Sequence, residues 1–89
     1  KSDTLGRTVQ MWTYRGTTGL MILAGVHLRI QGTYVGDTNT SGFWSGSREW
    51  VVGDTYTFEA YKDGWESQED TLTVQCIGSL NVYFRMVPL

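Results

Sequence analysis

Apolar and polar residues alternate along several short stretches of this chain. Every second residue is apolar across Val26–Ile30, and the same period of two returns across Tyr56–Tyr61. Successive side chains of a β-strand point to opposite faces of a sheet, so this period is typical of a strand with one buried face. The pattern therefore predicts strands over both stretches. The loop between them contains Gly32, Gly36 and Gly42.

Other stretches carry a similar pattern and are separated by clusters of turn residues. The chain shows no helical period and has a single proline, Pro88. The further strands predicted are Thr8–Tyr14, Thr33–Val35, Thr71–Ile77, Leu80–Val87 and a strand from Phe43 that breaks at Gly46-Ser47 and resumes over Glu49–Val52. Short strands divided by turns indicate a β-sandwich. We therefore expect an all-β fold, a single seven-stranded antiparallel sandwich with Greek-key connections.

The stretch Thr8–Tyr14 has large apolar groups on both of its faces. Val9 and Met11 share one face, and Trp12 and Tyr14 share the other. An edge strand covered on both sides has this composition, and so has a strand that meets a neighbouring molecule. The polar residues before it show no periodicity. We therefore expect residues 1–7 to form an N-terminal arm and residues 8–89 to form the sandwich domain.

Length, charge and hydropathy exclude several classes of function. The 89 residues suffice for one domain, and 13% of them are aromatic, which is typical of a folded chain. The formal net charge is −2, and the Lys and Arg residues are scattered, so no basic stripe is present for nucleic acid. No apolar run approaches the roughly 18–20 residues that span a bilayer. Lys1 at the start, without a signal-peptide pattern, suggests a mature product or an excised domain.

The single cysteine lies in one of the predicted strands. Within the segment LTVQCI, Cys76 is in phase with Leu72 and Val74. Residues in phase with apolar neighbours point to the core, and a free cysteine is often a small buried hydrophobe. We therefore expect Cys76 to be buried, with a reactive thiol as the alternative.

Four segments of the sequence resemble one family of sandwich domains. GLMILAGVHLRI is followed by GTYVGDTNTSGFW, then by VVGDTYTFEAYKDGWESQE and LNVYFRM. Over residues 19–87 these segments resemble the carboxypeptidase regulatory-like, or transthyretin-like, sandwich and the related PEGA-type surface domains. Thr38, Gly42 and Phe43 fall near the first characteristic turn, and Gly53 and Tyr56 fall near the second.

The last characteristic position of the family is a Gly-Tyr dipeptide, and Gly64-Trp65 stands there in this chain. Asn39 stands where the family usually has Asp. The resemblance implies a sandwich of transthyretin-like or immunoglobulin-like type. It also implies a non-catalytic accessory or structural module, commonly of a secreted or surface-anchored protein, and it implies no single ligand.

The sequence contains no constellation of residues suited to catalysis. Hydrolysis requires a base beside a nucleophile or a pair of carboxylates. The only histidine, His27, falls on the outward face of its predicted strand. One histidine cannot build a zinc site. We therefore expect no enzymatic activity, no catalytic residues and a surface imidazole at His27.

One loop has the opening of a calcium-binding loop. Asp37, Asn39 and Ser41 offer oxygen atoms at alternate positions, and a glycine follows. The twelfth position of such a loop should be Glu, but it is Arg48 here, with Glu49 one place late. The alternative is a turn whose Asx side chains bond to their own backbone. Calcium is the single cofactor that the sequence suggests.

The same loop contains an N-glycosylation sequon, Asn39-Thr40-Ser41. Sequons are modified in surface loops of secreted proteins. Asn39 is therefore a candidate glycosylation site if the protein is extracellular.

Four aromatic residues are candidates for a contact surface: Trp12, Tyr14, Trp44 and Trp50. Large aromatic groups either fill a small core or form an interface, where they are enriched. We expect a non-catalytic structural module of an extracellular or cell-surface protein. Its partners would be copies of itself, joined through edge strands into a filament or array, or neighbouring domains. The alternative is a carbohydrate-binding module that stacks exposed Trp and Tyr faces on sugar rings.

Overall fold

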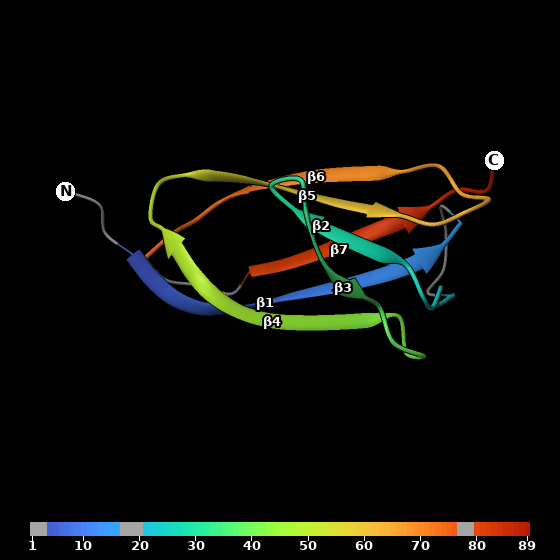
Figure 1. Cartoon of the computed structure of the whole chain (residues 1–89), viewed down its shortest axis with the longest axis horizontal. Helices are drawn as coiled ribbons and strands as arrows, with labels where there is room; N and C mark the ends of the chain where they lie inside the picture. The colour runs from blue at the N-terminus through green and yellow to red at the C-terminus, as the bar shows by residue number, and fades with distance from the viewer. Residues whose placement is uncertain (1–3, 17–20, 77–79) are drawn as a thin grey trace.

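The described part of the chain consists of strands and turns. The computed structural model describes residues 4–16, 21–76 and 80–89, and no helix forms within these ranges (Figure 1). The strands are β1 Thr4–Arg15, β2 His27–Ile30, β3 Thr33–Asp37, β4 Phe43–Val51, β5 Thr55–Tyr61, β6 Gln68–Thr73 and β7 Leu80–Met86. The all-β prediction is therefore confirmed.

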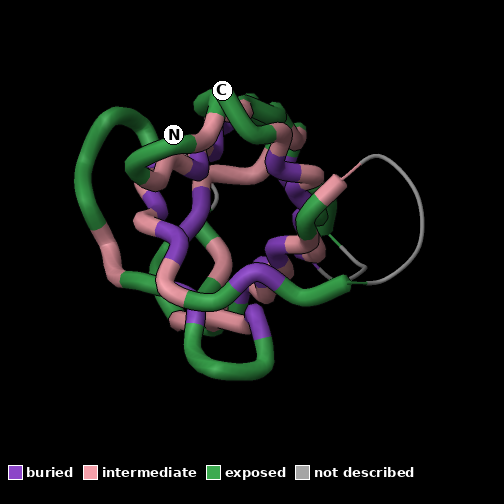
Figure 2. Tube along the Cα trace, turned by 90° about the vertical axis from the view of Figure 1, so that its right-hand side faces the viewer, coloured by how far each residue is buried: buried purple, intermediate pink, exposed green. Residues whose placement is uncertain are grey.

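The strands belong to two sheets that share one core. Sheet A has the order β4-β1-β7, and sheet B has the order β3-β2-β5-β6. Seen end on in Figure 2, the strands surround the core in the manner of a β-sandwich. The buried hydrophobic residues come from both sheets: Val9, Met11, Leu23, Val26, Leu28, Ile30, Trp50, Tyr56, Phe58, Ala60, Val74, Leu80, Val82, Phe84 and Met86.

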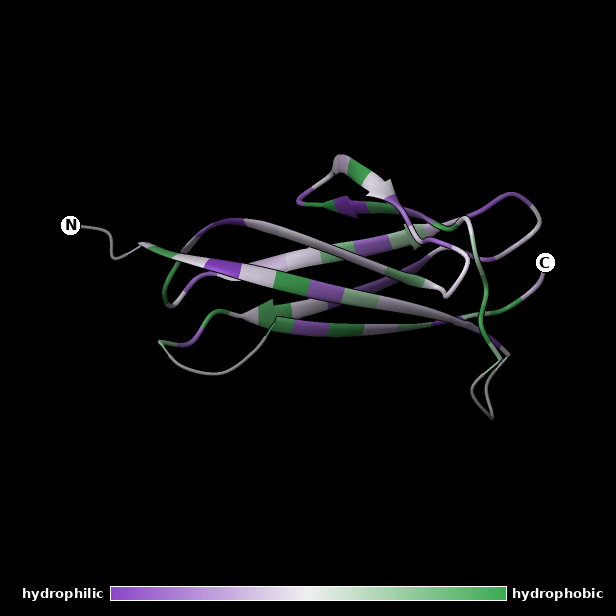
Figure 3. Ribbon diagram, turned by 90° about the horizontal axis from the view of Figure 1, so that it is seen from below, coloured by the Kyte–Doolittle hydropathy of each residue, from purple (hydrophilic) through white to green (hydrophobic). Residues whose placement is uncertain are grey.

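The period of two in the sequence determines which side chains enter this core. In β1, Val9 and Met11 are buried, whereas their neighbours Gln10 and Trp12 are only partly buried. Figure 3 shows the same alternation of hydrophobic and hydrophilic segments along the strands. Each strand contributes one face to the core because successive side chains point in opposite directions.

The direction and position of β1 differ from the prediction. β1 is antiparallel to β4 but parallel to β7, with Val9 opposite Leu80. The expectation of a wholly antiparallel fold is therefore wrong for this pair, because the period of two is the same for both directions of pairing. β1 is also the central strand of sheet A and not an edge.

Two element boundaries also differ from the sequence prediction. β1 begins at Thr4, which pairs with Val51, so residues 4–7 of the expected arm belong to the sheet, and residues 1–3 lie outside the described ranges. β4 runs from Phe43 to Val51 without a break at Gly46-Ser47. Both differences have one cause, because β1 and β4 form a long ladder whose hydrogen bonds override local composition.

Cys76 is exposed, contrary to the prediction that it is buried. β6 ends at Thr73, and Val74 is the last buried residue of this segment. Beyond the end of the strand, side chains no longer alternate between two faces, so a spacing of two residues from Val74 does not bury Cys76. Instead, Arg7 donates a 3.0 Å hydrogen bond to the carbonyl oxygen of Cys76. The remainder of the predicted strand, residue 77, lies outside the described ranges.

Two buried threonines connect sheet A to the segments before β2 and after β3 of sheet B. Thr13 is 0% exposed and Thr38 is 3% exposed. The Thr13 hydroxyl donates to the carbonyl oxygen of Leu23 at 2.7 Å and lies 3.1 Å from the Thr38 hydroxyl oxygen. The Thr38 hydroxyl oxygen also accepts a 3.0 Å hydrogen bond from the amide of Val26. Polar groups buried this deeply are stable only when they are hydrogen-bonded.

Replacement of the first of these hydroxyls tests how much the buried network contributes. We expect Thr13→Val to lower the free energy of unfolding by about 1–3 kcal/mol, because the buried Leu23 carbonyl loses its 2.7 Å donor and keeps only the longer, 3.4 Å hydrogen bond from the Thr38 hydroxyl. Urea denaturation measures the change. Thr71 is exposed on β6, so Thr71→Val serves as the control and should change stability by less than about 0.5 kcal/mol. Equal stability of the two variants would contradict the expectation.

Candidate functional site

A row of three aromatic side chains crosses the solvent-facing side of sheet A. Trp12 of β1 is the register partner of Phe43 in β4 and of Tyr83 in β7. Register partners point to the same side of a sheet. The neighbours of Trp12 in β1, Met11 and Thr13, are buried on the inner side, so this row lies on the outer side.

The rings of the row pack against one another. The Trp12 and Tyr83 rings are stacked, with centroids 4.8 Å apart and planes 9° apart. On the opposite side, the Phe43 ring lies 5.2 Å from the Trp12 ring at 45°. Trp12 is therefore held between two rings, while Tyr83 remains 55% exposed. Aromatic pairs in such geometries gain roughly 0.5–1.5 kcal/mol beyond their buried area.

A second row lies beside the first along the strands. Tyr14 forms an isolated antiparallel bridge with Ile22 and is the register partner of Arg85. The Arg85 guanidinium lies 5.3 Å from the centre of the Tyr14 ring, a cation–π geometry. Ile22 is 47% exposed. We call these two rows the outer aromatic face; its residues are Trp12, Phe43, Tyr83, Tyr14, Ile22 and Arg85.

The outer side of sheet A becomes polar toward the other end of the strands. The next row contains Ser45, Gln10 and Asn81. After it, the hydroxyl oxygens of Thr8 and Ser47 lie 2.8 Å apart. The side-chain oxygen of Asn81 is covered, and no group among the described residues donates to it. The outer aromatic face is therefore bounded by a polar margin on this side.

The four aromatic residues predicted as a contact surface fall into two groups. Trp12 and Tyr14 lie together on the outer aromatic face, so the prediction that they share a face is confirmed. Trp50 is 0% exposed, and its indole N–H donates to the Arg7 carbonyl at 3.0 Å. It is a core residue and cannot form a contact surface. Trp44 is partly buried and packs against the core.

The pleat of β4 explains why Trp44 and Trp50 are separated from the aromatic residues of the outer face. Positions 44 and 50 belong to the inward-facing series of this strand, whereas Phe43 belongs to the outward-facing one. The sequence reasoning missed Phe43, Ile22 and Arg85 as surface partners of Trp12 and Tyr14. Their proximity depends on strand order and register, which a single sequence does not display.

A polar cluster occupies the outer side of sheet B. His27 Nδ1 lies 2.7 Å from Asp37 Oδ1, and the Tyr34 hydroxyl donates to the same oxygen at 2.8 Å. The His27 side chain is 41% exposed, so its predicted outward direction is confirmed. The hydrogen bond from His27, and then that from Tyr34, lower the pKa of Asp37, and the bond to Asp37 raises the pKa of Tyr34.

Of the candidate calcium ligands Asp37, Asn39 and Ser41, the first two use their side-chain oxygens in hydrogen bonds to other groups, and Ser41 contributes its backbone amide to one of these bonds. Asn39 Oδ1 accepts hydrogen bonds from the amides of Ser41, at 2.9 Å, and Phe43, at 3.1 Å. This is the Asx turn that the sequence allowed as the alternative. The Asp37 carboxylate instead faces His27 and Tyr34. No group of three or more acidic, His or Cys side chains placed to hold a metal occurs in the ranges that the structure describes.

Asn39 is exposed at the turn before Phe43, where its glycosylation stays a prediction. Within the described residues, none of the elements is a helix with the length and apolar character needed to cross a membrane.

Comparisons with known proteins identify no family for this chain: no family model matches the sequence, and no curated protein matches it. The resemblance to carboxypeptidase regulatory-like domains therefore stays a prediction.

The contacts of Asp37 predict a dependence of stability on pH. A carboxyl whose pKa is lowered in the folded state stabilises the fold above its unfolded pKa of about 3.9, and the contribution is lost as the pH falls through the folded pKa. We expect Asp37→Asn to lower the free energy of unfolding at neutral pH by no more than about 1 kcal/mol, since the groups are exposed. The difference from wild type should vanish in acid.

Urea denaturation of both proteins across this pH range measures the difference. Asp63 is exposed in a turn and is the control. Asp63→Asn should leave the pH dependence as in wild type. A gap between wild type and Asp37→Asn that persists unchanged in acid would refute the assignment.

Proposed function

We propose that this domain is a non-catalytic structural and interaction module that associates with another copy of itself through the outer aromatic face. The observation that carries the proposal is the row Phe43–Trp12–Tyr83 on the outer side of sheet A. Tyr83 is 55% exposed although it stacks on Trp12. Tyr, Trp and Arg are the residues most enriched among those that dominate the energy of protein interfaces.

The position of β1 changes the mode of association that the sequence suggested. A strand can accept another chain only along a free edge. β1 is hydrogen-bonded to β4 on one side and to β7 on the other, so it cannot accept a further strand. The proposal therefore moves the contact from the edge of β1 to its outer face.

A second copy fits this face for two physical reasons. Two sheets pack face to face when apolar side chains of both can interdigitate, and a symmetric dimer places the same patch of each copy in contact. The formal net charge of −2 opposes such contact only weakly. Growth into a filament or array would need one further contact, for which β4 is a long edge strand.

The finer class of the fold and the location belong to the same proposal. A transthyretin-like, Greek-key sandwich in an extracellular or cell-surface protein is supported by the resemblance of the turns around Gly42, Gly53 and Gly64. Positive φ angles at these three glycines are consistent with tight turns.

Carbohydrate binding is the second candidate, and the exposed ring of Tyr83 beside the polar row of Gln10 and Asn81 favours it. Stacking on sugars requires an open ring face. Both sides of Trp12 are occupied by Tyr83 and Phe43, and Trp50 is fully buried. Self-association therefore ranks first, since an interface can use ring edges as well as faces.

Sedimentation velocity over a range of concentrations tests the proposal. We expect the average mass of wild type to rise with concentration, and Tyr83→Ser to raise the dissociation constant by about tenfold or more. The matched control is Tyr34→Ser, because Tyr34 is 54% exposed on sheet B, against 55% for Tyr83 on sheet A. It should associate like wild type.

A wild-type monomer at every concentration would refute self-association. Equal weakening by both Tyr substitutions would refute the choice of face. Binding of the monomer to a glycan array, lost in Tyr83→Ser, would instead support the carbohydrate candidate.

A further inference from the structure

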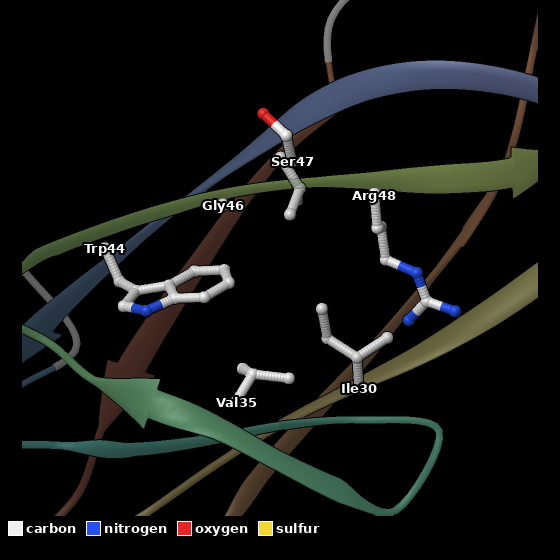
Figure 4. A pocket seen from close by; sticks show the side chains of 7 residues that line it. Ile30, Val35, Trp44, Gly46, Ser47 and Arg48 are labelled. Carbon is white, nitrogen blue, oxygen red and sulfur yellow. The ribbon is translucent and has the colours of Figure 1, made fainter.

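A pocket of about 230 Å³ opens at the side of the sandwich, away from the outer aromatic face. It lies where β4, an edge of sheet A, faces β3, an edge of sheet B. Figure 4 shows Trp44 and Arg48 projecting from β4 at the two ends of the pocket, with Val35 of β3 and Ile30 of β2 opposite them. The pocket therefore has lining residues from both sheets.

The hollow exists because the middle position on β4 has no side chain. Gly46 lies between Trp44 and Arg48 in the inward-facing series of the strand. A Cβ atom at Gly46 would lie 2.6 Å from Trp44 Cη2, and one at Gly36 would lie 2.5 Å from Trp44 Nε1. Both separations are too short for real atoms. The indole thus fits between two glycines and forms one end of the pocket.

The two ends of the pocket differ in chemistry. Val9, Ile30, Val35 and Trp44 provide an apolar lining. At the other end, the Arg48 guanidinium lies 4.8 Å from the centre of the Trp50 ring and 5.5 Å from that of Tyr56.

These rings orient Arg48, and among the described residues no carboxylate or carbonyl oxygen forms an ion pair or a hydrogen bond with it. Its five N–H donors are left to solvent or to a ligand. A planar guanidinium matches a carboxylate, which can accept two parallel hydrogen bonds.

We propose that this pocket binds a small monocarboxylate with an apolar body, such as a phenyl ring on a short arm. An apolar protein cavity of about 150 Å³ holds benzene, so a pocket of about 230 Å³ has room for a ring and one or two further carbon atoms. The ring lies against Trp44, Ile30 and Val35, and the carboxylate pairs with Arg48. The site is independent of the association proposed above.

Phenylacetate and its neutral counterpart phenylacetamide are suitable probes, because they differ mainly in charge. Titration of the isotope-labelled protein by NMR should show saturable shifts of the Trp44 indole N–H and the Gly46 amide. A ligand of this size is expected to bind with a dissociation constant on the order of 1 mM. Phenylacetamide should bind at least about tenfold more weakly, since it cannot form the charge-assisted pair.

Arg48→Gln should weaken phenylacetate binding by about tenfold or more and leave phenylacetamide unchanged. Arg29 is the matched control, because its guanidinium also stacks on a ring, 4.2 Å from the centre of Tyr61 on sheet B. Arg29→Gln should bind phenylacetate like wild type. Arg48 is exposed, so the variant is expected to fold, and circular dichroism checks this.

Three results would overturn the proposal: no saturable shift with phenylacetate, equal binding of the acid and the amide, or undiminished phenylacetate binding by folded Arg48→Gln. A fourth result, shifts confined to Tyr83 and its neighbours, would place the ligand on the outer aromatic face and would overturn the proposal as well.

Discussion

The hydrogen bond between the buried hydroxyls of Thr13 and Thr38 is the constraint on which the arrangement of this domain depends. It joins the central strand of sheet A to the turn that follows β3. The same network includes the Leu23 carbonyl and the Val26 amide. Ile22, on the outer side of β1, directly precedes Leu23, and the Asn39 turn that leads to Phe43 directly follows Thr38. The buried polar contact on the inner side of β1 therefore ties down the segments from which these two apolar groups reach the outer side.

Trp44 covers part of the core at the side of the sandwich where β4 faces β3. Two sheets whose edges diverge leave apolar core residues accessible to water. Here one indole reaches across the gap, and it can do so only because Gly36 and Gly46 have no Cβ atoms. Gly46 leaves space that the Trp44 ring partly occupies. The ring covers part of the core, and the space that it does not fill lies beside Arg48. Coverage of the core and formation of the pocket thus have the same origin.

The sequence predicts which side chains of a strand point inward, because successive residues of a pleated strand alternate between its two faces. Alternation separates Val9 and Met11 from Trp12 and Tyr14 correctly, because it depends only on neighbouring residues. The direction of β7, the central place of β1 and the inward side of Trp50 depend on register between distant strands. At Cys76 the alternation in the sequence continues past Thr73, where the strand ends, and the side chain is exposed.

The parallel pairing of β1 and β7 has a mechanical consequence. Because both strands run in the same direction, the start of β1 and the C-terminal end of the chain lie at opposite ends of the molecule in Figure 1, along its 44 Å long axis. Tension between these ends pulls the two strands past each other in shear. The hydrogen bonds from Val9 to Arg15 then share the load together, whereas an antiparallel pair pulled at neighbouring ends would open one bond at a time. The β1–β7 pair is therefore arranged to carry a load along this axis in shear.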